Sequence, residues 1–411
     1  MKHLPAGTRA RRRGRSAGAE TGGDGTHPLW LTAYAFTVVM AGTTLPTPLY
    51  PAYEQRWGFS ALVITVIFAV YAIGVIAALV FLGSLSDHVG RRPALLAALA
   101  LSAASAVAFL LADGLGALLT GRALSGLSAG ICTGTGTAAL VDLAPPGRHS
   151  FASGVATAAN LGGLGCGALL AGVLAASAPA PLRLPFWADL ALLAPAFAAV
   201  IRVPETVRPA GGRVLRRQRL RVPAQLRGTF LRAAAAGFAS FMMSGLFSAV
   251  APTFLATLLQ QPSPALAGAM VFALFTASAA GQLALSRMPA GTGLSAGCIG
   301  VIAGAGLVAA ALGLSSLALL IAGAVVAGLG QGLSVGAGLA ALNAEAPPDR
   351  RGEVASSYFV VLYVALSIPI AGVGLAIRIT GLRPAALIFT VLVAALATAC
   401  LVSLLTRRPV K

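Results

Sequence analysis

The chain has 411 residues, of which 57% are hydrophobic and only 10% are charged, and its mean hydropathy is +0.87. A soluble domain carries about 25% charged residues, so this chain has too few to cover a soluble core of its size. The net charge of +18 would suit nucleic acid, but the arginines stand in the tails and in short segments between apolar runs. That distribution is typical of a membrane protein, and we expect an integral membrane protein that binds no nucleic acid.

The N-terminal segment 1–28 is basic and rich in small residues, and we expect a disordered tail. A cleaved targeting peptide is the alternative, although no apolar region directly follows its arginines. Twelve apolar runs come next, each long enough to cross a bilayer as a helix. No segment alternates apolar and polar residues as a membrane barrel would. The runs cover 29–49, 61–82, 94–112, 115–140, 151–175, 185–203, 229–258, 265–286, 294–313, 316–342, 354–377 and 384–406.

The segment 206–228 is rich in arginine and is interrupted by Pro209, Gly211 and Pro223. It separates a first group of six runs (29–205) from a second group (229–406), which a short tail (407–411) follows. We expect this segment to be a linker that rests on anionic lipid headgroups. A surface helix over 213–221 is an alternative, although no clear apolar stripe supports it.

Lysine and arginine are unevenly divided between the two faces that twelve crossings define. Twenty-four lie on the face that holds both termini, four lie on the opposite face, and Arg122 lies within the fourth run. Cytoplasmic loops carry the excess of these residues, so we expect both termini in the cytoplasm and the chain in the plasma membrane.

The segment 126–148 is repeated at 328–350 when the chain is shifted by 202 residues. Twelve of the 23 aligned positions are identical, and both copies end in APP-x-R. The repeat is parallel, as in transporters whose halves are related by an axis along the membrane normal. Glycines four apart let helices approach closely, and beyond ordinary packing we expect some of them to let helices slide. These glycines are Gly126, Gly130, Gly163, Gly167, Gly328 and Gly332.

The segment GSLSDHVGRR (83–92) meets every key position of the pattern G-x-L-x-D-x-x-G-R-R. It resembles the signature between helices two and three of the major facilitator superfamily. Arg122-xxx-Gly126-xxx-Gly130 is similar to the family's helix-four motif, NLGGLGCGALLAGVLA (160–175) to its antiporter motif, and VPETV (203–207) to the usual exit of helix six. The resemblance spans about 29–406 and implies an all-α integral membrane fold, in which two six-helix bundles alternate access to a central site.

The resemblance also implies a role for the charges in this segment. Asp87 is implied to meet the start of helix eleven near Glu353, and Arg91 to pair with an acidic group at the foot of helix four, where Asp142 is the only candidate. We hypothesise a latch that holds the cytoplasmic side shut in the outward-facing state. The alternative, a topology signal plus a turn, leaves the aspartate and the second glycine unexplained. The latch comprises Gly83, Asp87, Gly90, Arg91, Arg92 and Asp142.

Two charged residues fall inside the apolar runs. A cation within a bilayer costs at least about 2.5–3.5 kcal/mol, so we expect Arg122 to line the substrate cavity; snorkelling to the headgroups is the alternative. Asp189 could carry a coupling proton, because burial favours its protonated form, or it could be an interfacial residue beside Trp187. The expected substrate or coupling cavity contains Arg122, Asn160, Asp189, Gln331, Tyr34, Met242 and Tyr358.

No enzyme chemistry is visible in the sequence. The cysteines and histidines lack metal-ligand spacing and no nucleotide-binding loop occurs, so we expect no cofactor, no metal and no ATP-driven transport. We expect a monomer that exports a small apolar or cationic organic compound by proton antiport. Uptake of a nutrient is an alternative, because helix one lacks a carboxylate and Ala168 replaces the usual proline of the antiporter motif. A non-transporting membrane sensor is a further alternative.

Overall fold

The computed structural model describes residues 26–83, 85–177, 179–207, 220–289, 291–347 and 350–406. The expected tails and a surface helix over 213–221 lie almost wholly outside these residues. All regular elements in the described ranges are helices, and twelve segments are long and apolar enough to cross a membrane, as predicted. The elements are α1 (His27–Thr44), η1 (Thr47–Leu49), α2 (Tyr50–Trp57), α3 (Ala61–Leu82), α4 (Leu85–Val89), α5 (Arg91–Leu110), α6 (Leu115–Asp142), α7 (His149–Ser177), α8 (Leu184–Arg202), η2 (Ala224–Leu226), α9 (Arg227–Ala249), α10 (Ala251–Thr257), α11 (Pro264–Ala284), η3 (Leu285–Arg287), α12 (Gly293–Leu314), α13 (Leu317–Glu345), α14 (Arg351–Thr380) and α15 (Leu382–Leu405).

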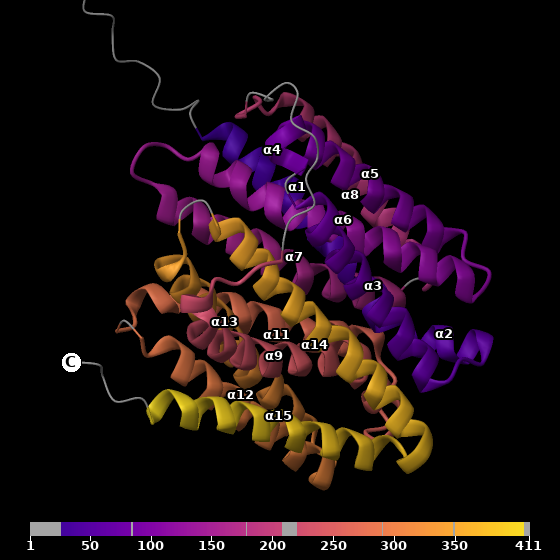
Figure 1. The fold of residues 1–411 in the computed structure, drawn as a ribbon. Helices are drawn as coiled ribbons and strands as arrows, with labels where there is room; N and C mark the ends of the chain where they lie inside the picture. The colour runs from indigo at the N-terminus through magenta and orange to yellow at the C-terminus, as the bar shows by residue number, and fades with distance from the viewer. Residues whose placement is uncertain are drawn as a thin grey trace, which may run out of the picture.

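The helices form two groups that lie side by side (Figure 1). We call α1–α8 the N-terminal half and α9–α15 the C-terminal half. Two seams join them, because α7 packs along α11 and α3 packs along α14. We call the end of the bundle that holds α4, the end of α8 and the start of α9 the linker end. The opposite end, which holds α2 and α10, is the far end.

The first and seventh spans are broken near the far end, where the sequence predicted continuous helices over 29–49 and 229–258. The first is divided after Thr44 into α1, η1 and α2, and the seventh is divided at Val250 into α9 and α10. Proline has no N–H to donate and suits the first turn of a new helix. Pro48 and Pro252 stand at such starts, which explains why each helix begins again there.

The expected turn at 83–93 is more helical than predicted. Its centre forms the short helix α4, and α5 begins at Arg91, three residues before the predicted run. Gly90 separates the two helices with a φ of +103°, a conformation that favours glycine. Pro93 fits within the first turn of α5, so it does not delay the helix start.

The six glycines predicted to let helices slide lie where two helices of the same half touch. A Cβ on Gly126 of α6 would lie 2.9 Å from the Cα atom of Gly74 on α3, so no larger residue fits without a shift. A neighbouring helix crowds the other five in the same way: Gly130, Gly163, Gly167, Gly328 and Gly332. The α7–α11 seam uses different glycines, among them Gly172 and Gly268. The six glycines thus set the packing inside each half, and their sliding stays a prediction.

Candidate functional site

Three of the predicted latch residues meet at the linker end. The Nη1 atom of Arg91 lies 2.7 Å from Oδ1 of Asp87 and donates to Oγ of Ser86 at 2.6 Å. Its Nε atom donates to Oδ2 of Asp142 at 3.1 Å. The hydroxyl of Thr206, which follows α8, donates to the same carboxylate oxygen at 3.3 Å. Arg91 therefore ties together α4, α5, the end of α6 and, through Asp142, the exit of α8.

Glu205 is a second centre of this cluster, and the sequence analysis did not single it out. Its carboxylate accepts hydrogen bonds from the backbone N–H groups of Arg91 at 2.8 Å and Arg92 at 3.0 Å, and so caps the start of α5. Partial burial raises the pKa of Glu205, but these two bonds and further backbone bonds, including one from Val207, outweigh it and hold the pKa below its ordinary value. A Cβ on Gly90 would lie 2.5 Å from Oε2 of Glu205, which is a second reason for glycine there.

The bridge from the latch to the C-terminal half is not formed. No hydrogen bond or ion pair joins Asp87 to α14 within the described ranges, and the Asp87 side chain is 61% exposed. Gly83 has an ordinary helical conformation, so its backbone does not require glycine. The side chain of Arg92 has no polar partner among the described residues, and its part in the latch stays a prediction. The observed cluster thus organises the linker end of the N-terminal half alone.

Arg122 occupies a box of aromatic rings in the interior. Its side chain is buried, with 1% exposure, which excludes snorkelling in this structure. The Nη1 atom donates to the carbonyl oxygen of Thr43 at 2.6 Å, and Nη2 donates to the hydroxyl of Tyr50. The guanidinium carbon lies 5.4 Å, 5.9 Å and 5.8 Å from the ring centres of Tyr50, Phe68 and Tyr71. Rings at such distances attract a cation, and the carbonyl of Thr43 that Arg122 reaches stands in the last turn of α1.

The positive charge of Arg122 has no counter-ion. No carboxylate pairs with it in the part of the chain that the structure describes, and its Nε atom has no hydrogen-bond acceptor. The box also reaches the C-terminal half. Tyr71 meets Tyr363 of α14 edge-on at 6.4 Å, and Tyr363 meets Phe241 of α9 at 5.8 Å. Arg122 therefore supplies an uncompensated donor next to the contact between the halves.

Asp189 is a buried carboxylate on the other side of α1. It is 3% exposed, whereas neighbouring Trp187 is 59% exposed, so the two do not share one interfacial environment. A Cβ on Gly42 of α1 would lie 3.0 Å from Oδ2 of Asp189. No ion pair or hydrogen bond reaches Asp189 from any described residue. Arg122 contacts α1 at Thr43, the next residue, so both charges adjoin the last turn of this helix without pairing.

Tyr34 lies on the wall of an apolar cavity of about 690 Å³ between α1, α7 and α11. Trp30, Phe151 and Leu283 also line it, so helices of both halves contribute. The hydroxyl of Tyr34 donates to the carbonyl oxygen of Leu192 on α8 at 3.0 Å. This hydrogen bond holds the ring at the wall, and the cavity could take the apolar part of a small molecule.

The remaining predicted cavity residues are spread over several helices. Met242 of α9 is buried, and Asn160 of α7 is half-buried without a polar partner among the described residues. Gln331 of α13 and Tyr358 of α14 are buried, and the Oε1 and hydroxyl atoms of these side chains lack partners. No hydrogen bond joins these four to each other or to Arg122 in the described ranges. Of the seven predicted residues, Tyr34 lines the apolar cavity described above and the other six do not, and a cavity shared by all seven stays a prediction.

Metal binding has no obvious site, since no group of three or more His, Cys, Asp or Glu occurs among the residues that the structure describes.

Solved structures with the same fold are transporters. The human organic anion transporter MFSD10 (TETRAN) is 18% identical, with a TM-score of 0.68 over 93% of this chain and 100% of that one. A bacterial homologue of the human lysosomal transporter Spinster, inward-facing and unoccupied, is 16% identical, with a TM-score of 0.68 over 95% of this chain and 100% of that one. The occupied inward-facing form of the same bacterial homologue is 16% identical, with a TM-score of 0.62 over 91% of this chain and 96% of that one. No curated protein matches the chain in sequence.

The family model covers most of the chain. Residues 32–370 match the model of the Major Facilitator Superfamily, a range that begins within the first span and ends within the eleventh of the twelve. The transporter fold and this match agree with the resemblance carried by residues 83–92. The chain is a multi-pass membrane protein and a member of the Major Facilitator Superfamily of secondary transporters.

Proposed function

We propose that the chain exports a small organic compound in exchange for protons by alternating access. The observation that carries this proposal is the lone buried carboxyl of Asp189. An ionised carboxylate without a cation or hydrogen bonds is costly in an apolar site, so the group is held neutral there by a bound proton. When the helices around it part and water reaches the site, the carboxyl can release that proton. Proton release would thereby be coupled to the change of access.

The latch cluster supplies a site where access can be controlled. Asp87 remains largely exposed beside Arg91, so it is free to meet the start of α14 when the linker end closes. A contact of this kind contributes a few kcal/mol at most, which is enough to bias a two-state equilibrium. The distribution of Lys and Arg supports a cytoplasmic linker end, with both termini on that side of the plasma membrane. We propose that the monomer is the transporting unit.

A second candidate function is transport of an organic anion. The specific observation is Arg122, whose buried charge has no counter-ion and whose Nε donor is free. A cationic group would be repelled at this position, whereas a carboxylate would compensate the charge and accept its hydrogen bonds. The apolar cavity supports an apolar body for either substrate. The anion transporter of the same fold gives this candidate a precedent.

Flux into proteoliposomes tests both candidates. With an acidic lumen, an antiporter accumulates its substrate as protons leave, so uptake of a lipophilic cation and of an apolar carboxylate should be compared. We expect flux of the true substrate to follow the pH gradient in the wild type and to become independent of it in Asp189→Asn. Asp113→Asn is the matched control, because Asp113 is an exposed carboxylate at the far end, and it should behave as the wild type. Gradient-dependent flux in Asp189→Asn would contradict the proposed role of Asp189.

A further inference from the structure

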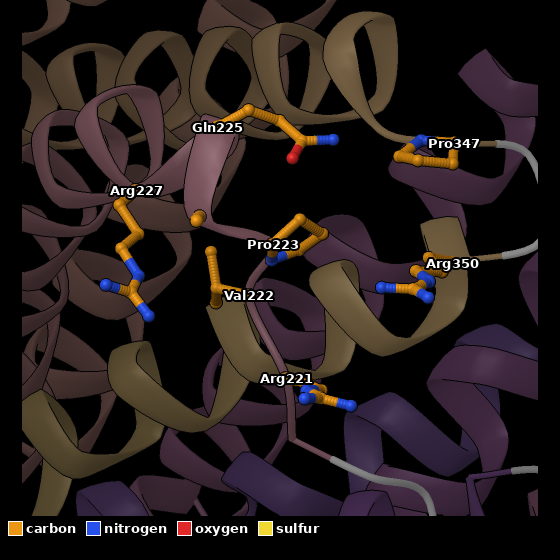
Figure 2. A pocket seen from close by; sticks show the side chains of 8 residues that line it. Arg221, Val222, Pro223, Gln225, Arg227, Pro347 and Arg350 are labelled. Atoms are coloured by element: carbon orange, nitrogen blue, oxygen red, sulfur yellow. The ribbon is translucent and has the colours of Figure 1, made fainter.

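A basic pocket lies at the linker end of the C-terminal half. It encloses about 580 Å³. The guanidinium groups of Arg221, Arg227 and Arg350 stand around it, together with Pro223 and the amide of Gln225 (Figure 2). Arg350 lies 123 residues further along the chain than Arg227, so the fold brings two distant basic segments to one place. None of these residues belongs to the transport site described above.

Buried neighbours fix the walls of the basic pocket. Leu226, between Gln225 and Arg227, is fully buried, and Ala346, next to Pro347 of the rim, is 4% exposed. Both belong to one apolar cluster under the pocket, together with Val354 and Tyr358 of α14. The segments that carry the three arginines are therefore anchored to a packed core.

The backbone adds positive potential to the three guanidinium groups. The pocket lies beside the start of α9, which follows η2 directly, and beside the start of α14, for which Arg350 is the N-cap. The first N–H groups of a helix have no acceptor within it, and the helix dipole places partial positive charge there. The N–H groups of Arg227 and Arg350 already donate to the carbonyls of Ala224 and Pro347, so the two helix starts favour an anion through their dipoles.

No carboxylate among the described residues pairs with Arg221 or Arg227. Glu345 accepts a hydrogen bond from the hydroxyl of Thr229 at 3.1 Å, away from the pocket lining. Arg221 and Arg227 have no ion pair or side-chain hydrogen bond with any described residue. Two guanidinium groups are thus available in the pocket for bidentate contacts to an oxyanion.

The position of the pocket at the ends of two membrane spans favours a lipid as the source of that oxyanion. The membrane-spanning segments Ala224–Ala249 and Arg351–Thr380 both begin at the pocket rim. The first residues of a span stand where the hydrocarbon region gives way to headgroups. Arg148, Arg202 and Arg351 are equally exposed at the same end but line no such cavity, so a general topology signal does not account for the convergence.

We propose that the basic pocket binds a phosphate group, and that the phosphodiester of an anionic phospholipid is its main source. This site is independent of the proposed transport function, because neither Arg122 nor Asp189 belongs to the basic pocket. A soluble phosphate compound carries the same chemistry, and the experiment separates the two sources.

The experiment compares two triple variants of the full-length protein. Arg221→Gln/Arg227→Gln/Arg350→Gln removes the pocket charges, whereas Arg148→Gln/Arg202→Gln/Arg351→Gln removes the same net charge elsewhere at the same end. Each protein in detergent is equilibrated with equal amounts of phosphatidylglycerol and phosphatidylcholine, and the bound lipids are counted by native mass spectrometry. In a second arm, each protein is titrated with inorganic pyrophosphate, and the shift of its thermal unfolding midpoint reports binding. Size-exclusion chromatography checks that both triple variants fold. If the pocket triple does not fold, the single variant Arg227→Gln replaces it in the same measurements.

We expect the wild type to select phosphatidylglycerol, and the pocket triple to lose this selection by on the order of a hundredfold, since each of the three arginines contributes about fivefold at about 1 kcal/mol. The control triple should stay within about threefold of the wild type, and added salt should weaken selection. Pyrophosphate binding without lipid selection would support the phosphate site but assign it a soluble ligand. Equal losses in both triples, or neither lipid selection nor pyrophosphate binding in the wild type, would overturn the proposal.

Discussion

The ion pair between Arg91 and Asp142 gives a quantitative prediction for the latch. The side chains of Arg91 and Asp142 are 15% and 35% exposed, whereas that of Asp87 is 61% exposed. A charge-assisted hydrogen bond contributes about 1.5–3 kcal/mol when water is excluded, and an exposed pair about 0.2–1 kcal/mol. We therefore expect a coupling energy of about 1–2 kcal/mol between Arg91 and Asp142. Between Arg91 and Asp87, an ion pair whose aspartate is mostly in water, we expect about 0.5 kcal/mol.

Double-mutant cycles measure both couplings. The variants are Arg91→Gln, Asp142→Asn, Asp87→Asn and the two doubles that contain Arg91→Gln, each followed by thermal unfolding in detergent and by transport rate in proteoliposomes. The unfolding cycle should rank Asp142 above Asp87. The transport cycle should show a larger effect of Asp87 than unfolding does, because its contact with α14 would form only when the linker end closes. An Asp87 coupling that equals or exceeds that of Asp142 in unfolding would refute the reasoning from exposure.

Three further predictions concern single sites. Arg122→Gln should lower substrate flux at least tenfold while changing the unfolding midpoint little. The variant loses two charge-assisted hydrogen bonds of about 1.5–3 kcal/mol each. It also removes a buried charge that costs at least about 2.5–3.5 kcal/mol, and this gain offsets much of the loss. A variant that unfolds would contradict this balance. The lowered pKa of Glu205 means that its carboxylate stabilises the fold above the ordinary titration range of glutamate, and that this contribution is lost as the pH falls through the lowered pKa. The melting temperatures of wild type and Glu205→Gln should therefore differ between about pH 6 and 8 and converge as the pH falls below the ordinary titration range of glutamate; a constant difference would argue against the cap. Gly126→Ala should destabilise the protein by about 1–3 kcal/mol in chemical unfolding, because its Cβ would overlap α3, whereas Gly134→Ala, which faces open space, should not destabilise it.

The sequence predicted the twelve spans because the length and hydropathy of each run suffice to identify a membrane helix. The contact between Arg91 and Asp87 was part of the latch that the family resemblance implied, and helical spacing could not have predicted it because Gly90 separates the two helices. The pairing with Asp142 rested on the family resemblance and on the absence of another acid nearby. The contact with α14 depends on which end of the transporter is closed, and no pattern in one sequence specifies that.

Glu205 escaped prediction because its partners are backbone N–H groups 113 and 114 residues away, which leave no side-chain pattern to detect. The VPETV motif at the exit of α8 was the available signal. The rings around Arg122 also come from separate helices, so only tertiary packing brings Tyr50 and Tyr71 to one guanidinium. The break after α1 had a visible cause in Pro46 and Pro48, which a count of apolar residues does not weigh.

The capping of α5 by Glu205 has a mechanical consequence for the connection between the halves. Hydrogen bonds to Glu205 from Arg91, Arg92 and Val207 fix the chain where it leaves α8, and Arg221 lines the basic pocket where the described chain resumes. Thirteen peptide steps join Val207 to Leu220, and thirteen steps reach at most roughly 45 Å. Any movement of one half against the other must therefore keep these two anchored points within that distance.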